Sequence, residues 1–167
     1  MTVKNLNDLY LDGLKDIYSA CKQSIPVTEE MARAAKSDDL RKALEASAKG
    51  TQEGMGQMEA LCRKHGADPY GEHCKGMEGL VAEARKHALE SQFDNDETQD
   101  AAIIAQYQRL AHYAITGYGT LKAWAKRLGL DDDKKILDEC TAATYHGDET
   151  MTKIAVKGGV NKAAAAV

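Results

Sequence analysis

The fold is decided by one long stretch, residues 97–128, which reads ETQDAAIIAQYQRLAHYAITGYGTLKAWAKRL. Apolar side chains recur in it every three or four residues, a spacing that places them on one face of an α-helix. The positions in register are Ile103, Tyr107, Leu110, Ala111, Ala114, Tyr118, Leu121, Ala125 and Leu128. Gly129 follows and can supply a left-handed cap. We therefore predict a long amphipathic helix that must bury this face against other helices.

Three further long helices are predicted around this stretch. The first covers about residues 4–36, and Pro26 is expected to kink it rather than end it, because the helical pattern resumes afterwards. The second covers residues 37–66, between a serine cap and a closing glycine, and the last begins at residue 131. A shorter helix is predicted within residues 70–92.

These elements predict an all-α fold, a four-helix bundle with an extra short helix between helices two and three. The bundle is expected to occupy residues 1–157, and the simple stretch 158–167 is expected to be a flexible C-terminal tail. Because the link between helices two and three is long, helix three could begin at either end of the bundle. Acidic runs such as residues 131–133 are interpreted as helix starts, where the helix dipole favours negative charge.

Composition narrows the classes of function. The 167 residues carry a formal net charge of −4, without the basic footprint that phosphate contacts need, so nucleic acid is not expected as a partner. No apolar run approaches the roughly 20 residues that span a bilayer, and no secretory signal is visible, so we expect a cytoplasmic protein without a membrane partner. The four cysteines are expected to be free thiols. They are Cys21, Cys62, Cys74 and Cys140.

Three short motifs stand out along the chain: residues 14–23 (LKDIYSACKQ), residues 74–80 (CKGMEGL) and the pair His112-Tyr113 followed by residues 117–120 (GYGT). They resemble the YciE/YciF family of bacterial ferritin-like proteins. Their order and separation match the family up to about Val156. The resemblance implies a ferritin-like fold, a homodimer and a role linked to bacterial stress.

The same resemblance implies a dimetal site whose ligands this chain has replaced. Family members project carboxylates and a histidine inward from the four long helices, a ligand set that suits iron or manganese. Here Cys21 replaces the carboxylate of helix one, while Ser47 replaces the histidine of helix two and Gly50 replaces its carboxylate. Ala111 and Ala114 flank the His-Tyr pair of helix three, while residues 143–144 (Ala-Thr) replace the pair of helix four.

Small residues in place of carboxylates leave space, and three outcomes stay open. Tyrosine and methionine side chains could fill the centre: Tyr10, Tyr18, Tyr107, Tyr118, Met55, Met58 and Met151. A small-molecule pocket could remain there, lined by Tyr18, Cys21, Ser47, Gly50, Tyr107, Ala111, Ala114 and Thr144. A displaced metal site could use His112, His146 and Glu149. Three glycines inside helix two, at positions 50, 54 and 56, need either a close helix approach or a bound group to explain them.

From these observations we expect a ferritin-like, stress-associated protein with a degenerate dimetal site. It is expected to be non-catalytic, to need no cofactor, to form a homodimer, and to have a small molecule as an optional ligand. The alternative is an iron or manganese oxidase or ferroxidase, or a metal-binding protein, that uses the displaced ligands.

Overall fold

Helices account for all the regular structure in the computed structural model, which describes residues 3–166. The long helices are α1 (Leu6–Ala34), α2 (Asp38–Lys64), α4 (Asp96–Arg127) and α5 (Asp131–Val156). The short ones are α3 (Lys75–Ala84), a π-helical turn η1 (Arg85–Leu89) and α6 (Val160–Ala164). The all-α prediction is therefore confirmed. None of these helices, within the described residues, is long and apolar enough to cross a membrane.

Polar caps fix where three of the four long helices begin. The side chains of Asn5, Ser37 and Asn95 each accept a hydrogen bond from the backbone N–H three residues later, which satisfies one of the free donors of α1, α2 and α4. Gly66 and Gly129 follow α2 and α4 with positive φ angles of 69° and 72°. Pro26 lies inside α1, and the helix continues past it as expected.

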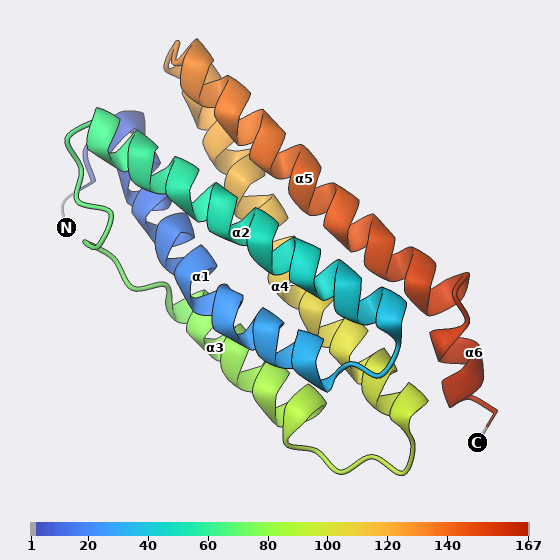
Figure 1. The fold of residues 1–167 in the computed structure, drawn as a ribbon. Coiled ribbons are helices and arrows are strands. Elements are labelled where there is room, and N and C mark those ends of the chain that lie inside the picture. Colours follow the sequence, from blue (N-terminus) through green and yellow to red (C-terminus); the bar gives the residue numbers. More distant parts are fainter. Residues whose placement is uncertain (1–2, 167) are drawn as a thin grey trace.

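The topology left open by the sequence is settled at the start of α4. Asp100 lies in the first turns of α4 and accepts hydrogen bonds from the backbone N–H groups of Lys36 and Ser37, at 2.9 and 2.8 Å. Since these residues join α1 to α2, α4 begins at the end of the bundle where α2 begins. The link through α3 therefore runs back along the bundle, and α2 and α4 point the same way (Figure 1). This order has one long crossover connection, like that of ferritin-like bundles.

Each long helix packs against two neighbours: α1 and α2 form one pair, α4 and α5 the other, and the α1–α4 and α2–α5 contacts close the ring. α3 lies outside this ring against α1 and α4 (Figure 1). Two clusters of buried side chains fill the interior, one toward each end. Large members without exposed surface include Leu14 and Met58 in one cluster and Leu44 and Met151 in the other.

Half of the segment predicted as a tail, 158–167, forms the short helix α6. Gly159 precedes the helix with a φ of 89°, and Val160 is buried in the cluster that α4 and α5 share. α6 packs against α4 and α5. Residue 167 lies outside the described residues, and the flexibility of this segment stays a prediction.

Candidate functional site

A tyrosine and a cysteine meet at the centre of the bundle, where the resemblance places metal ligands. Tyr118 extends from α4 and shares a hydrogen bond with the thiol of Cys21 on α1, with 3.1 Å between oxygen and sulfur. Both side chains are buried, at 3% exposure each. On the α2 side the hydroxyl faces Gly54, where a Cβ atom would lie only 2.7 Å from the tyrosine oxygen. Gly54 is therefore the glycine of helix two that a close approach requires.

Both partners of this pair are neutral at physiological pH. Burial raises the pKa of the Cys21 thiol to about 12, against a smaller opposing effect of the Tyr118 hydrogen bond. Burial also raises the pKa of Tyr118 well above its ordinary value, and the adjacent Cys21 raises it further. Because the thiolate is the nucleophile and the metal ligand, a thiol held protonated is poorly suited to either role.

A second tyrosine fills the next layer of the bundle. Tyr107 lies about three turns before Tyr118 on α4, and it is 8% exposed. Its hydroxyl faces Gly147 of α5, where a Cβ atom would lie 2.9 Å from the oxygen and 3.6 Å from the hydroxyl of Ser47 on α2. Burial raises the pKa of Tyr107, and the Ser47 hydroxyl partly opposes that shift.

A third tyrosine of α4 joins the bundle to α3. The hydroxyl of Tyr113 donates a hydrogen bond to Asp16 at 3.1 Å and contacts the thiol of Cys74 at 2.9 Å. Its ring lies against Gly76, where a Cβ atom would be 2.8 Å away. Each of the three tyrosines thus packs against a glycine of a different helix, which we call the tyrosine–glycine contacts: Tyr118 with Gly54, Tyr107 with Gly147, and Tyr113 with Gly76.

Of the eight residues predicted to line a central pocket, five lie around Tyr118 and Tyr107. Cys21, Tyr107 and Ala111 are buried, and Ser47 is half-buried beside Tyr107. Ala114 is half-buried and packs on the same cluster as Tyr118. Tyr107 and Tyr118, two of the side chains expected to fill the centre, are buried with their hydroxyls beside Gly147 and Gly54.

The other three predicted pocket residues lie elsewhere or at the margin. Tyr18 is buried, but its ring packs edge-on against Tyr70 of the link after α2, with centroids 5.5 Å apart. Gly50 is exposed, with nothing within 4 Å of a Cβ placed on it, so the prediction was one turn out on α2. Thr144 is half-buried and donates its hydroxyl to the Cys140 carbonyl. Ala143 is exposed, so Gly147, not Ala143, supplies the small surface on α5.

The predicted displaced metal ligands do not meet. His112 is exposed and pairs with Asp148 at 3.1 Å, while His146 is exposed. Glu149 is exposed as well and lies 4.0 Å from Lys153. Among residues 3–166, no group of three or more His, Cys, Asp or Glu side chains is placed to share a metal ion. The central donors are a thiol, phenols and a serine hydroxyl, a set that does not fit two iron or manganese ions.

Sequence reasoning missed a buried charged cluster that lies at one end of the bundle. Asp133, in the first turn of α5, has no exposed surface and accepts hydrogen bonds from Tyr10 of α1 at 2.8 Å and from Lys64 at 2.6 Å. His65, directly after α2, lies 2.6 Å from the same carboxylate. Burial alone would raise the pKa of Asp133, but the hydrogen bonds from Lys64, His65 and Tyr10 hold it below its ordinary value. Asp133 is one of three consecutive acids at a helix start, so the sequence pattern did not distinguish it from its two neighbours.

Comparison with known proteins places the whole chain in one family. Residues 5–165 match the family model described as "Domain of unknown function (DUF892)". The chain is 33% identical over 168 residues to protein YciF of Escherichia coli (strain K12), covering 98% of each chain. The crystal structure of the E. coli stress protein YciF superposes with a TM-score of 0.88 at 30% identity, covering 96% of this chain and 99% of the other. A solved structure of YcfI from Rhodopseudomonas palustris, described as a candidate structural protein, has a TM-score of 0.85 at 32% identity and covers 92% and 97%.

Proposed function

This chain belongs to the DUF892 family and resembles the stress protein YciF over nearly its whole length, and from that premise we propose that it is a non-catalytic, stress-associated structural bundle. The resemblance to the YciE/YciF proteins inferred from the sequence is confirmed. Within the proposal the protein acts in the bacterial cytoplasm as a homodimer, without nucleic acid or cofactor.

The observation that carries the proposal is the Cys21–Tyr118 pair at the bundle centre. A dimetal oxidase needs bridging carboxylates that hold two cations at fixed spacing. Here two neutral groups share one hydrogen bond, and Gly54 makes room for the tyrosine. A metal at this position would have to displace the ring of Tyr118 and deprotonate a thiol whose pKa is about 12. Among the described residues, no group of three or more His, Cys, Asp or Glu side chains is placed to share a metal ion, which supports a bundle without redox chemistry.

The same filling argues against a small molecule at the centre. A ligand there would have to expel two tyrosine rings that are at most 8% exposed. Their hydroxyls already have polar neighbours, Cys21 for Tyr118 and Ser47 for Tyr107. Expelling them would leave these neighbours without partners, which costs free energy in a buried site.

Metal analysis tests the proposal directly. Protein produced in medium supplemented with iron and manganese should retain less than one equivalent of either metal per chain by mass spectrometry. It should also oxidise Fe(II) no faster than buffer does. A carboxylate-ligated ferritin-like protein, produced in the same medium, is the positive control. Two tightly held metal ions per chain, or ferroxidase turnover, would contradict the proposal and favour the oxidase alternative.

A further inference from the structure

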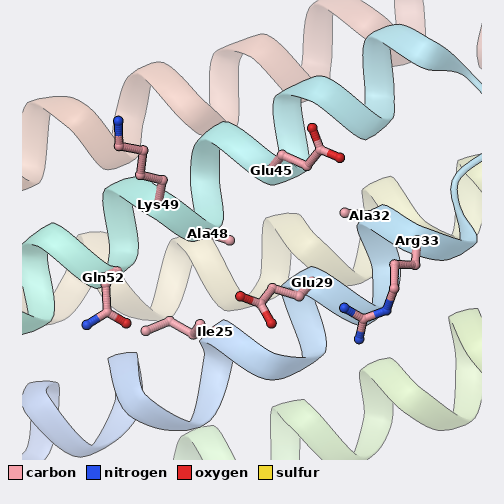
Figure 2. Close-up of a pocket in the computed structure, with 8 residues that line it drawn as sticks. All are labelled: Ile25, Glu29, Ala32, Arg33, Glu45, Ala48, Lys49 and Gln52. Atoms are coloured by element: carbon pink, nitrogen blue, oxygen red, sulfur yellow. The ribbon is translucent and has the colours of Figure 1, made fainter.

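The seam along which α1 and α2 pack is open over one part of its length and covered over the next. The open part is a groove that ends at Ile25 and Gln52 (Figure 2). Further toward the end of α2, Tyr70 of the α2–α3 link lies over the seam, and its ring packs edge-on against Tyr18 of α1, with centroids 5.5 Å apart. Tyr70 is 59% exposed, whereas Tyr18 is 5% exposed. The link thus places a tyrosine that faces solvent against one that does not.

Contacts from both helices hold the ring of Tyr70 in this position. The ammonium nitrogen of Lys22, on α1, lies 5.5 Å from the centroid of the ring, which suits a cation–π interaction. The guanidinium of Arg63, on α2, is hydrogen-bonded to the same tyrosine. Burial raises the pKa of Tyr18 to about 12, and a hydrogen bond between the hydroxyls of Tyr18 and Tyr70 adds to the rise. The two phenols are therefore neighbours through their rings and through their oxygen atoms.

This geometry is the one that oxidative coupling of two tyrosines needs. In dityrosine, the new bond joins the ring carbons that lie next to the two hydroxyl-bearing carbons. Because the hydroxyls of Tyr18 and Tyr70 are hydrogen-bonded, these carbons of the two rings are close together. Among the tyrosines that the structure describes, these are the two whose rings meet. Tyr70 lies in a turn outside the helices, so its ring can close on Tyr18 without moving a helix.

We propose that Tyr18 and Tyr70 form an oxidative modification site, at which a diffusing one-electron oxidant joins the two rings as dityrosine. The exposed Tyr70 meets the oxidant, gives it an electron and loses its hydroxyl proton to water. The resulting radical takes a hydrogen atom from Tyr18 across their hydrogen bond, so the radical moves to the buried ring. A second oxidation of Tyr70 then gives two adjacent radicals.

The two radicals couple into one carbon–carbon bond. The hydrogen on each coupled carbon is then lost to solvent as a proton while the oxygen of the same ring takes one up, so both phenols are restored. With hydrogen peroxide as the source of both oxidising equivalents, two tyrosines and one peroxide give one dityrosine and two waters. This modification goes beyond the proposed function, because the oxidant comes from outside and the bundle itself needs no metal for it.

The consequence is a covalent tie between α1 and the link that follows α2. The bond closes a loop from residue 18 to residue 70, which contains most of both helices. A cross-link of this kind stabilises a fold mainly by restricting the unfolded chain, as a disulfide does. Oxidation at this site should therefore strengthen the bundle.

Peroxidase treatment of the full chain tests the inference. A plant peroxidase with hydrogen peroxide supplies one-electron oxidations, and mass spectrometry then examines a tryptic digest. We expect peptide 16–22 (DIYSACK) joined to peptide 65–75 (HGADPYGEHCK), with the loss of two hydrogen atoms and with dityrosine fluorescence. Each peptide contains a single tyrosine. The digest must be reduced and alkylated first, because Cys21 and Cys74 lie on the same two peptides and a disulfide would also join them.

Three variants and one solvent condition serve as controls. Tyr18→Phe and Tyr70→Phe should each lose the joined peptides, whereas Tyr145→Phe, at an exposed tyrosine of α5, should retain them. In urea the same treatment should give no preference for this pair over other tyrosine pairs. The cross-linked protein should unfold at least about 5 °C above equally treated Tyr70→Phe.

Oxidation of Tyr145 without any joined peptides would overturn the inference, and so would an equal preference for the pair in urea. Neither result would change the metal content of the protein. Failure of this modification site is therefore distinct from failure of the proposed metal-free, non-catalytic bundle.

Discussion

The centre of the bundle and its Asp133 end both hold a buried tyrosine hydroxyl, but in opposite electrostatic settings. At the centre, Tyr118 meets a neutral thiol beside a glycine. At the end, Tyr10 donates to the carboxylate of Asp133, which also faces Lys64 and His65. The difference teaches that two buried tyrosine hydroxyls of one bundle can have unlike partners, a neutral thiol at the centre and a carboxylate at the end. The end depends on a network of charges, and the centre depends on fit.

The largest effect is expected from a substitution that removes the Asp133 carboxylate from the end of the bundle. Asp133→Ala removes the acceptor that Tyr10, Lys64 and His65 share, and it leaves the Tyr10 hydroxyl buried without a partner. We expect a loss of about 3 kcal/mol in the free energy of unfolding, measured by urea denaturation. Asp132→Ala, at the exposed neighbour, should cost less than about 1 kcal/mol. Equal losses for the two variants would show that Asp133 acts only as a helix-start acid.

Removing one hydroxyl from each region sharpens the comparison. Tyr10→Phe removes the hydrogen bond that the hydroxyl donates to the buried carboxylate of Asp133. It should lower the free energy of unfolding by about 2 kcal/mol, because hydrogen bonds to charged groups are stronger than those between neutral groups. Tyr118→Phe removes a bond to a thiol, a weak partner, and should cost about 0.5 kcal/mol. The same denaturation measurement compares them. A larger loss at Tyr118 would contradict the view that fit, rather than polarity, holds the centre together.

Glycine substitutions on α2 test that fit. Gly54→Ala places a methyl group against the Tyr118 hydroxyl and should destabilise the protein by about 1 kcal/mol, after the gain in helix propensity is included. Gly50→Ala, one turn earlier, meets nothing within 4 Å and should stabilise it by about 0.5–1 kcal/mol. The opposite signs are the result to look for in thermal unfolding. Stabilisation by both changes would mean that Tyr118 moves aside at no cost.

The smallest expected effect is a difference in acid sensitivity. The pKa of Asp133 is lower in the folded chain than in the unfolded chain, so this group stabilises the fold above its ordinary pKa. That stabilisation is lost as the pH falls through the folded pKa. Between pH 6 and pH 3 the unmodified protein should therefore lose more of its free energy of unfolding than Asp133→Asn does. Parallel pH profiles for the two proteins would exclude a role for the Asp133 charge.

The helices could be predicted because their signals are local. Apolar spacing and a closing glycine predict a helix over residues 97–128, and the structure has Asp96–Arg127. The sequence did not indicate in the same way which glycine of α2 faces the bundle centre. A glycine adds no side chain to the apolar pattern, so Gly50 and Gly54 look equivalent until Tyr118 of another helix is placed beside one of them.

The Asp133 network lay beyond sequence reasoning for a related reason. Three consecutive acids begin α5, and each has the same local role at the helix start. Only the meeting of α5 with the end of α2 and the start of α1 selects the third. The ring contact of Tyr18 could not be predicted either, because its partner, Tyr70, lies in a link whose path no local pattern fixes.

The three tyrosine–glycine contacts together determine where α4 can sit along its own axis. One helical turn corresponds to a rise of about 5.4 Å, so a slide by one turn would carry all three hydroxyls past their glycines at once. Tyr118 would then leave Gly54, Tyr107 would leave Gly147 and Tyr113 would leave Gly76, each of them on a different helix. Apolar stripes alone tolerate such slippage, because one leucine or alanine can replace another. In this bundle α4 therefore has a single axial register, which the shape of these three contacts specifies.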